Sequence, residues 1–122
     1  MTNHQRIEAY FQSLNARDWT AFVETLHPEV LYELPQTREC VRGRKAYLDF
    51  NITFPGDWTL EVVRVIADDA RSAAEIVLRL DGQAMPAVVF FEFTDGLVAR
   101  ITDYWPEDYE PPMRVSKFVE RT

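Results

Sequence analysis

One carboxylate and one phenol are the side chains in this chain best suited to chemistry. Asp103 lies in the stretch ITDYWPEDYE, where a strand should end at Pro106, and it shares the apolar side of that strand with Ile101 and Trp105. A carboxylate on such a face is costly unless it is hydrogen-bonded. Desolvation moves its pKa toward neutrality, which suits a general acid or base. Tyr10, on the first predicted helix, is a usable hydrogen-bond donor, so we take Asp103 and Tyr10 as the candidate catalytic residues.

Both residues also have a simpler interpretation. Asp103 lies close to the predicted end of its strand, where a carboxylate can be solvated without any function. Tyr10 lies on the apolar stripe of its helix, and many tyrosines in such positions only fill the hydrophobic core. The sequence leaves both alternatives open.

Other reactive side chains have less support. His27 precedes Pro28, so we expect it to cap the C-terminal end of a helix. Cys40 is the only cysteine and has no histidine near it in the sequence, so we expect a small buried residue rather than a nucleophile. His4 and His27 fit no metal-ligand spacing, and the four glycines form no phosphate-binding loop. We therefore predict no metal and no cofactor.

Length, charge and hydropathy exclude several classes of function. The 122 residues suit one domain, residues 1–122, and the apolar fraction of 47% can form a real core. A net charge of −7 with no basic run disfavours binding to nucleic acid or to an anionic membrane surface. No segment approaches the roughly 20 apolar residues of a membrane span, and MTNHQRIEAY lacks the apolar stretch of a signal peptide. We expect a cytoplasmic protein.

Periodicity predicts helices first and a long sheet afterwards. Three helices are expected: one after Thr2 with Ile7, Tyr10, Phe11 and Leu14 on its buried stripe, one from Asp18 to Pro28 with Trp19, Phe22, Val23 and Leu26, and one over residues 44–54. EVLYEL and RECVRG predict two paired short strands. TLEVVRVIAD, SAAEIVLRL, AVVFFEF and LVARITDYW alternate with period two and predict an antiparallel meander. The expected fold is α+β, a cone-shaped curved antiparallel sheet around three helices.

A curved sheet wrapped around helices does not close completely, so this architecture predicts a conical cavity. On the penultimate strand the inward residues are Ala87, Val89, Phe91 and Phe93. On the last strand they are Ala99, Ile101, Asp103 and Trp105, opposite Val98, Arg100, Thr102 and Tyr104. Arg79 is expected to be an outward, solvated charge. The convex face is expected to pair with a second copy, giving a homodimer.

The last residues, EPPMRVSKFVERT, contain Pro111 and Pro112, which block a regular helix. We expect this tail to lie extended, either over the mouth of the cone or along the edge of the dimer.

The order and spacing of three segments resemble a known superfamily. AYFQSLNARDWTAFVETLHPEVLYELP, RGRKAYLDF and FTDGLVARITDYW together are similar to the nuclear transport factor 2-like superfamily, in particular to its SnoaL-like polyketide cyclases and ketosteroid isomerases. The resemblance covers essentially the whole chain. It implies the helix-lined curved sheet described above, a dimer through the sheet, and an apolar cone as the ligand site.

The resemblance also implies roles for individual residues. Tyr10 takes the place of the helix-1 tyrosine in the oxyanion hole of the isomerases. The isomerase base, however, falls at Leu34 and the second oxyanion acid near Val89, which argues against steroid isomerisation by that mechanism. Phe50 and Trp105 match pocket-wall residues.

Two other groups of this superfamily favour Asp103. Limonene-epoxide hydrolases have an aspartate that helps to activate water at the position of Asp103, but their arginine and aspartate partners fall here at Val77 and Arg79. SnoaL-like cyclases use a pocket aspartate as the base in an aldol step, and Asp103 could resemble it. The residues expected to bind a ligand are Leu34, Phe50, Val89, Phe91, Ile101 and Trp105.

Three functions remain open from the sequence. The first is an enzyme that acts on a small hydrophobic carbonyl compound, with Asp103 as general base and Tyr10 as oxyanion donor. The second is a non-catalytic binder of an apolar metabolite. The third is a protein-interaction module, which a filled cone and a large apolar sheet face would favour.

Overall fold

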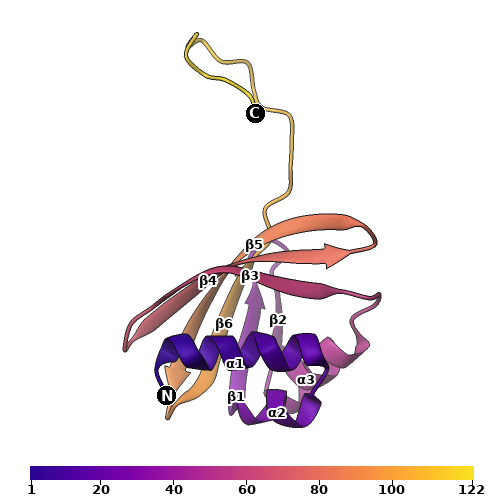
Figure 1. Ribbon diagram of the computed structural model, residues 1–122, viewed down its shortest axis with the longest axis vertical. Helices are drawn as coiled ribbons and strands as arrows, with labels where there is room; N and C mark the ends of the chain where they lie inside the picture. Colours follow the sequence, from indigo (N-terminus) through magenta and orange to yellow (C-terminus); the bar gives the residue numbers. More distant parts are fainter.

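The computed structural model describes residues 1–122, and Figure 1 shows three helices in the hollow of a strongly curved sheet. The helices are α1 (Asn3–Ala16), α2 (Trp19–Glu24) and α3 (Arg44–Thr53). The strands are β1 (Leu26–Leu34), β2 (Glu39–Arg42), β3 (Thr59–Ala67), β4 (Arg71–Leu80), β5 (Gln83–Thr94) and β6 (Leu97–Tyr104). The α+β class and the number of helices and strands are as predicted.

The six strands form one sheet in the order β2-β1-β6-β5-β4-β3. Strands β3 to β6 form the predicted antiparallel meander, and β2 returns antiparallel beside β1. The sheet is not antiparallel throughout, because β1 and β6 run parallel, with Tyr32 beside Ile101. This long-range pairing places β6 between β1 and β5 and brings residues from both ends of the chain to one wall.

Local capping explains where the first two helices begin. Thr2 caps α1, and its side chain accepts a hydrogen bond from the Gln5 N–H while the Gln5 side chain accepts one from the Thr2 N–H. Asp18 caps α2 by accepting from the Ala21 N–H at 3.1 Å. These two polar residues fix the helix starts that the sequence predicted.

The end of the second helix differs from the prediction. Helix α2 ends at Glu24, so Leu26 and His27 belong to β1 rather than to the helix. The reason is pairing with the last strand: the Val98 N–H donates to the Thr25 carbonyl, and Leu26 lies beside Val98. The prediction of His27 as a helix cap is therefore wrong; its Nδ1 accepts from the Glu29 N–H at 3.1 Å within the strand.

Two further predictions of burial are wrong. Val98 was expected to face outward, but it is buried. The pairing of β5 with β6 shifts register there, since Glu92 lies opposite Arg100 and Phe93 opposite Val98, and the extra residue on β6 reverses the faces of the residues before Arg100. Cys40 was expected to be buried, but it is exposed, because β2 is an edge strand that is covered on one side only.

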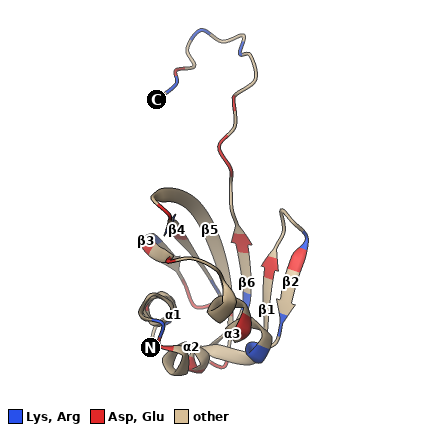
Figure 2. Cartoon of the chain, turned by 90° about the vertical axis from the view of Figure 1, so that its right-hand side faces the viewer, with Lys and Arg blue, Asp and Glu red and all other residues tan.

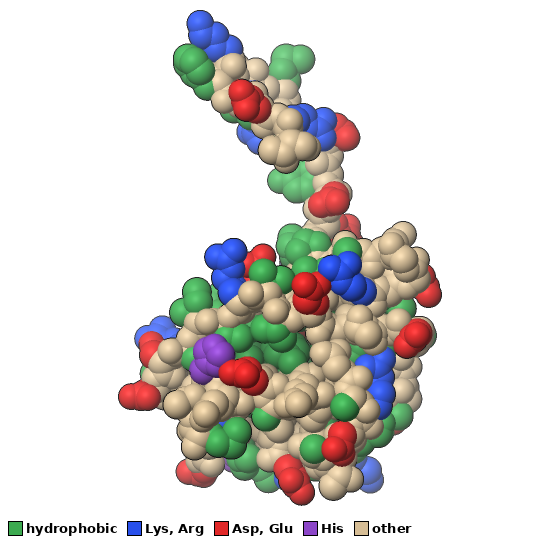
Figure 3. Space-filling view, in the orientation of Figure 1, with side chains coloured by type: hydrophobic (Ala, Val, Ile, Leu, Met, Phe, Trp, Pro, Cys, Tyr) green, Lys and Arg blue, Asp and Glu red, His purple; other side chains and the backbone are tan.

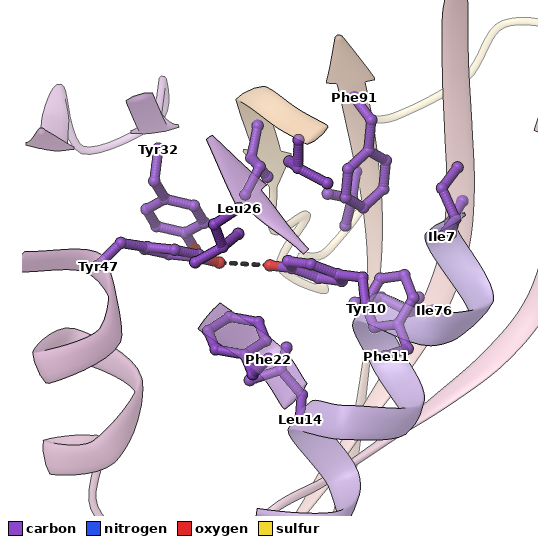
Figure 4. Close-up of a cluster of buried hydrophobic side chains, with 14 of the residues drawn as sticks. Ile7, Tyr10, Phe11, Leu14, Phe22, Leu26, Tyr32, Tyr47, Ile76 and Phe91 are labelled. Atoms are coloured by element: carbon purple, nitrogen blue, oxygen red, sulfur yellow. Dashed lines mark hydrogen bonds between the residues drawn. The ribbon is translucent and has the colours of Figure 1, made fainter. Parts of the chain in front are cut away.

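The core lies between α1, α2 and the concave face of the sheet, and aromatic rings dominate it. Figure 4 shows Tyr10 and Phe11 of α1 facing Phe91 of β5. The ring of Phe91 makes edge-on contacts with Tyr10 at 5.3 Å and with Phe11 at 5.9 Å between centroids. Phe22 of α2 packs beside Tyr10 at 5.3 Å. The alternation predicted for β5 is confirmed, because Ala87, Val89 and Phe91 are buried.

After Tyr104 the chain leaves the sheet and has no helix or strand. Figure 1 and Figure 2 show residues 106–122 projecting away from the body. We call this segment the C-terminal arm. Apart from Glu107 near its start, it does not reach the cone.

Burial predicts how two isoleucines on helices differ in their contribution to stability. Ile7→Ala should lower the free energy of unfolding by about 2–5 kcal/mol, because Ile7 is fully buried and its loss leaves a cavity. Ile52→Ala removes the same atoms from a side chain that is 49% exposed and should cost below about 1 kcal/mol. Urea unfolding followed by circular dichroism measures both, and equal costs would contradict the placement of the core.

Candidate functional site

An apolar cavity of about 620 Å³ lies between α3, α1 and the concave face of the sheet. Of its 21 lining residues 16 are hydrophobic, so polar groups are few and any ligand would be held mainly by apolar contact. The residues that matter for chemistry are the members of the wall with polar side-chain groups: Tyr10, Tyr32, Gln36, Thr37, Tyr47, Asn51, Asp103 and Glu107. Tyr10 and Asp103 thus line one cavity.

Asp103 is a buried carboxylate with one free oxygen. Its side chain is 6% exposed, so the alternative of a solvated strand-end residue does not hold. Oδ2 accepts a hydrogen bond from the Tyr32 hydroxyl at 2.5 Å, whereas Oδ1 is buried without a partner. Burial raises the pKa of Asp103 to about 6, although the Tyr32 and Trp105 side chains oppose the shift. A carboxylate in this condition is poised to exchange a proton near neutral pH.

Three buried tyrosines connect Asp103 to α1. The hydroxyls of Tyr10 and Tyr47 share a hydrogen bond, which Figure 4 draws as a dashed line. The Tyr47 ring stacks on Tyr32 with 4.7 Å between centroids. Burial is the main cause that raises the pKa of all three phenols, so they stay neutral and keep their protons as donors. The buried part of the wall therefore offers neutral donors beside one titratable acceptor, Asp103.

The elements explain why these side chains meet. Val30, Tyr32 and Leu34 alternate on the inward face of β1, and the parallel pairing with β6 places the Tyr32 ring beside Asp103. Tyr47 lies one helical turn before Phe50 on the side of α3 that faces the sheet. Sequence reasoning missed Tyr32 and Tyr47. The same alternation in EVLYEL, and the spacing in KAYLDF, could have identified both as inward residues.

The structure divides the predicted ligand-binding residues into two groups. Leu34, Phe50, Val89 and Trp105 line the cavity. Phe91 and Ile101 do not, because the rings of α1 fill the narrow end of the cone and bury both residues completely in the core. Tyr10 belongs to both places, since it lines the cavity and packs against Phe91.

Contacts from neighbouring segments hold two tryptophans in the wall of the cavity. The Trp105 N–H donates to Gln36 Oε1 at 2.5 Å, which ties the end of β6 to the turn after β1. Arg17 stacks over the Trp58 ring at 3.5 Å and donates to the Trp58 carbonyl. These contacts keep two tryptophans at the wall.

Several other groups fall outside the site. Arg79 faces outward, as predicted, and donates to Glu61 at 2.7 Å. No group of three or more His, Cys, Asp and Glu side chains is arranged to hold a metal ion. None of the helices has the length and apolar character required to cross a membrane.

Comparison with known proteins identifies the family. The model of the SnoaL-like domain matches residues 7–101. The chain belongs to the SnoaL-like family. This confirms the family that the sequence motifs suggested.

Solved structures of SnoaL-like and related proteins share the fold. A candidate ketosteroid isomerase from Kribbella flavida DSM 17836 is 47% identical, with a TM-score of 0.93 over 97% of this chain and 87% of that one. A protein of unknown function like nuclear transport factor 2, from Burkholderia xenovorans LB400, is 23% identical, with a TM-score of 0.82 over 98% and 94%. An LEH-like epoxide hydrolase from M. tuberculosis is 19% identical, with a TM-score of 0.70 over 84% of this chain and 80% of that one. A comparison with curated proteins finds no match.

The raised pKa of Asp103 predicts a specific dependence of stability on pH. The folded-state pKa of about 6 lies above that of an unfolded aspartate, so the native state binds the proton more tightly. This tighter proton binding contributes about 3 kcal/mol to the free energy of unfolding. The contribution is fully present below about pH 4 and is lost as the pH rises through 6. Asp103→Asn should therefore match the unmodified protein near pH 4 and be more stable near pH 7.5.

Urea unfolding at a series of pH values tests this, and Asp108→Asn in the exposed arm is the matched control. A difference between Asp103→Asn and the unmodified protein that does not change from pH 4 to pH 7.5 would contradict the raised pKa.

Tyr32 should lower the pKa of Asp103 through its hydrogen bond. In Tyr32→Phe the carboxylate loses that donor, so its pKa should rise further above 6. NMR titration of the Asp103 carboxyl carbon measures the change, and Tyr104→Phe, on the outward face of β6, serves as control. An unchanged or lowered pKa in Tyr32→Phe would show that the hydrogen bond does not act on the charged form.

Proposed function

We propose that this SnoaL-like protein binds a small hydrophobic carbonyl compound in the cone and catalyses its enolisation, with Asp103 as general base. One observation carries the proposal: Asp103 is the buried carboxylate of an apolar cavity, and its Oδ1 has no hydrogen-bond partner. An unpaired buried acceptor lowers the stability of the fold, and a bound ligand that gives Oδ1 a proton or a hydrogen bond would explain why it is retained.

The chemistry follows from the positions of donors and acceptor. With a pKa of about 6, most Asp103 side chains are ionised at pH 7 and can accept a proton at Oδ1. The C–H bond next to the substrate carbonyl breaks, its proton moves to Oδ1, and its electron pair becomes an enolate. The neutral hydroxyl of Tyr10 or Tyr47 donates to the enolate oxygen, which is a strong interaction in an apolar site.

Two outcomes of the enolate conserve atoms and electrons. Return of the proton from Asp103 to a different carbon gives an isomer. In an aldol cyclisation the enolate carbon instead attacks a second carbonyl in the same molecule, a C–C bond forms as the C=O π bond breaks, and the new alkoxide takes the proton back from Asp103. The relatives in Kribbella flavida and among candidate polyketide cyclases support these two reaction classes as the first to test.

The position of Asp103 in the sheet supports its role as base. Asp103 lies directly opposite Val89 on β5, and Leu34 of β1 lines the same cavity. Both positions where the family resemblance implies carboxylates are thus apolar in this chain. A single acid on the strand between β1 and β5 replaces them, so isomerisation here would rely on one carboxylate.

Removing the proposed base should abolish turnover. On a panel of β,γ-unsaturated ketones and linear polyketone analogues, Asp103→Asn should lower kcat/KM by about 10² to 10⁴ for any compound that the protein converts. Asp108→Asn, in the arm, should leave kcat/KM unchanged. Turnover by Asp103→Asn equal to that of the unmodified protein would overturn the assignment.

The pH profile gives an independent test of the same group. Because the base acts when ionised, kcat/KM should rise tenfold per pH unit below pH 6 and level off above it. Measurements between pH 4.5 and 8.5, with folding checked at each pH, define the apparent pKa. A profile that falls as the pH rises through 6 would require an acid instead.

A non-catalytic binder is the second candidate. It is favoured by the pairing of Tyr10 with Tyr47 and of Tyr32 with Asp103, since a rigid wall of satisfied hydroxyls can orient a ligand without reacting. A bound ligand recovered unchanged after long incubation would support this function. The open cavity gives little support to the third candidate, a protein-interaction module with a filled cone.

Assembly and location are part of the proposal. The convex face of the sheet exposes an apolar cluster made of Ile66, Val88, Phe90 and Tyr104. We propose that two copies pair through this cluster and that the homodimer works in the cytoplasm on a small molecule rather than on nucleic acid or membrane, consistent with the net charge of −7.

A further inference from the structure

The C-terminal arm carries a set of apolar side chains that nothing in its own chain covers. They are more than half exposed and include some of the most exposed large residues of the protein: Tyr109, Met113, Val115, Phe118 and Val119. The arm side chains make hydrogen bonds and ion pairs only within the arm, such as Arg121 to Glu110 at 3.0 Å. Figure 3 shows these hydrophobic groups on a segment that stands clear of the body.

The arm lies outside the residues that match the SnoaL-like domain, but a related solved structure has a counterpart of most of it. The SnoaL-like match ends at residue 101. The Kribbella flavida structure nevertheless covers 97% of this chain with a TM-score of 0.93, and the remaining 3% is only about four residues. Most of the arm therefore has a counterpart there. An extended segment without contacts loses conformational entropy for no gain, so a reproducible arm requires a surface to bind.

Charge on the arm separates along its length. Glu107, Asp108 and Glu110 lie near the root, whereas the outer part carries three basic residues, Arg114, Lys117 and Arg121, and one acidic residue, Glu120, as Figure 2 shows in red and blue. The whole chain has a net charge of −7, so the outer half of the arm is a basic segment on an acidic protein. It is complementary to the surface of another copy.

The root of the arm is continuous with the convex cluster. Tyr104, which belongs to that cluster, packs edge-on against Phe90 at 6.0 Å, and the arm begins two residues later. A partner seated on the convex face would therefore lie next to the point where the arm leaves the sheet.

We propose that the C-terminal arm of each molecule clasps a second copy of this chain. Val115 and Phe118 pack against the body of the partner, and the basic end faces its acidic surface. The exchange is reciprocal, because a two-fold axis relates the two arms. It goes beyond the proposed catalytic function and does not depend on it, although Trp105 and Glu107, at the root of the arm, also line the cavity.

Sedimentation equilibrium of the full chain and of point variants tests the clasp. Val115→Asp and Phe118→Asp should each weaken dimerisation by about tenfold or more, because each places a charge where an apolar side chain is buried. Ser116→Asp adds the same charge to the same exposed arm and should have a smaller effect. Since all three side chains are exposed in one copy, circular dichroism should show unchanged folding.

A chain that ends at Glu110 gives the second measurement. It keeps the cavity residues of the arm root but lacks the apolar and basic end, and its dimer should dissociate at concentrations where the full chain remains paired. A full chain that is monomeric, or a truncated chain with the same dissociation constant, would overturn the proposal. Turnover is measured separately, so loss of the dimer and loss of catalysis are distinguishable.

Photo-cross-linking decides where the arm binds. A benzoylphenylalanine at position 115 is introduced into protein mixed in equal amounts from ¹⁴N and ¹⁵N cultures. The clasp predicts adducts that join an arm of one label to a body of the other. Adducts of a single label only would mean that the arm folds back on its own chain, and the absence of adducts would mean that it binds neither. Either result would overturn the proposal.

Discussion

The burial of one carboxylate in an apolar hollow is the constraint on which the rest of this structure depends. Asp103 keeps its place because the Tyr32 hydroxyl satisfies one oxygen and the strands on both sides hold the backbone in register. Tyr47 then supports Tyr32 by stacking, and Tyr10 completes the row by bonding to Tyr47. Besides filling the narrow end of the cone, the helices bring Tyr10 and Tyr47 to Tyr32.

Burying the Asp103 carboxylate lowers the stability of the fold. The unpartnered Oδ1 and the desolvated charge both favour a protonated or neutral side chain, and the fold retains the acid instead. The apolar core around Phe91 and Ile101 provides the free energy that makes this tolerable. A scaffold selected only for stability would place an apolar residue at Asp103, as it already does at Leu34 and Val89.

Features that depend on local periodicity could be predicted from the sequence. Features that depend on the pairing of strands distant in the chain could not. Alternation placed Asp103 inward and Arg79 outward, and caps located the helix starts, because each depends on neighbouring residues. The end of α2 could not be found in this way, since pairing of Leu26 with Val98 decides it. Cys40 was misjudged because the position of an edge strand is a property of the whole sheet. Tyr32 and Tyr47 were within reach of the same reasoning, but their meeting with Asp103 depends on a parallel pairing that no local pattern shows.

That parallel pairing also fixes how late the polar wall of the cavity can form during synthesis. Tyr32 and Asp103 are 71 residues apart, and β6 must insert between β1 and β5 before their side chains can touch. Contacts of such long range form late and slowly. A nascent chain can therefore build α1, its capping box and the first hairpins long before Tyr32 and Asp103 meet. The contact between Tyr32 and Asp103 therefore forms in one step with the docking of the last strand, so the carboxylate enters its apolar cavity only when the sheet is complete.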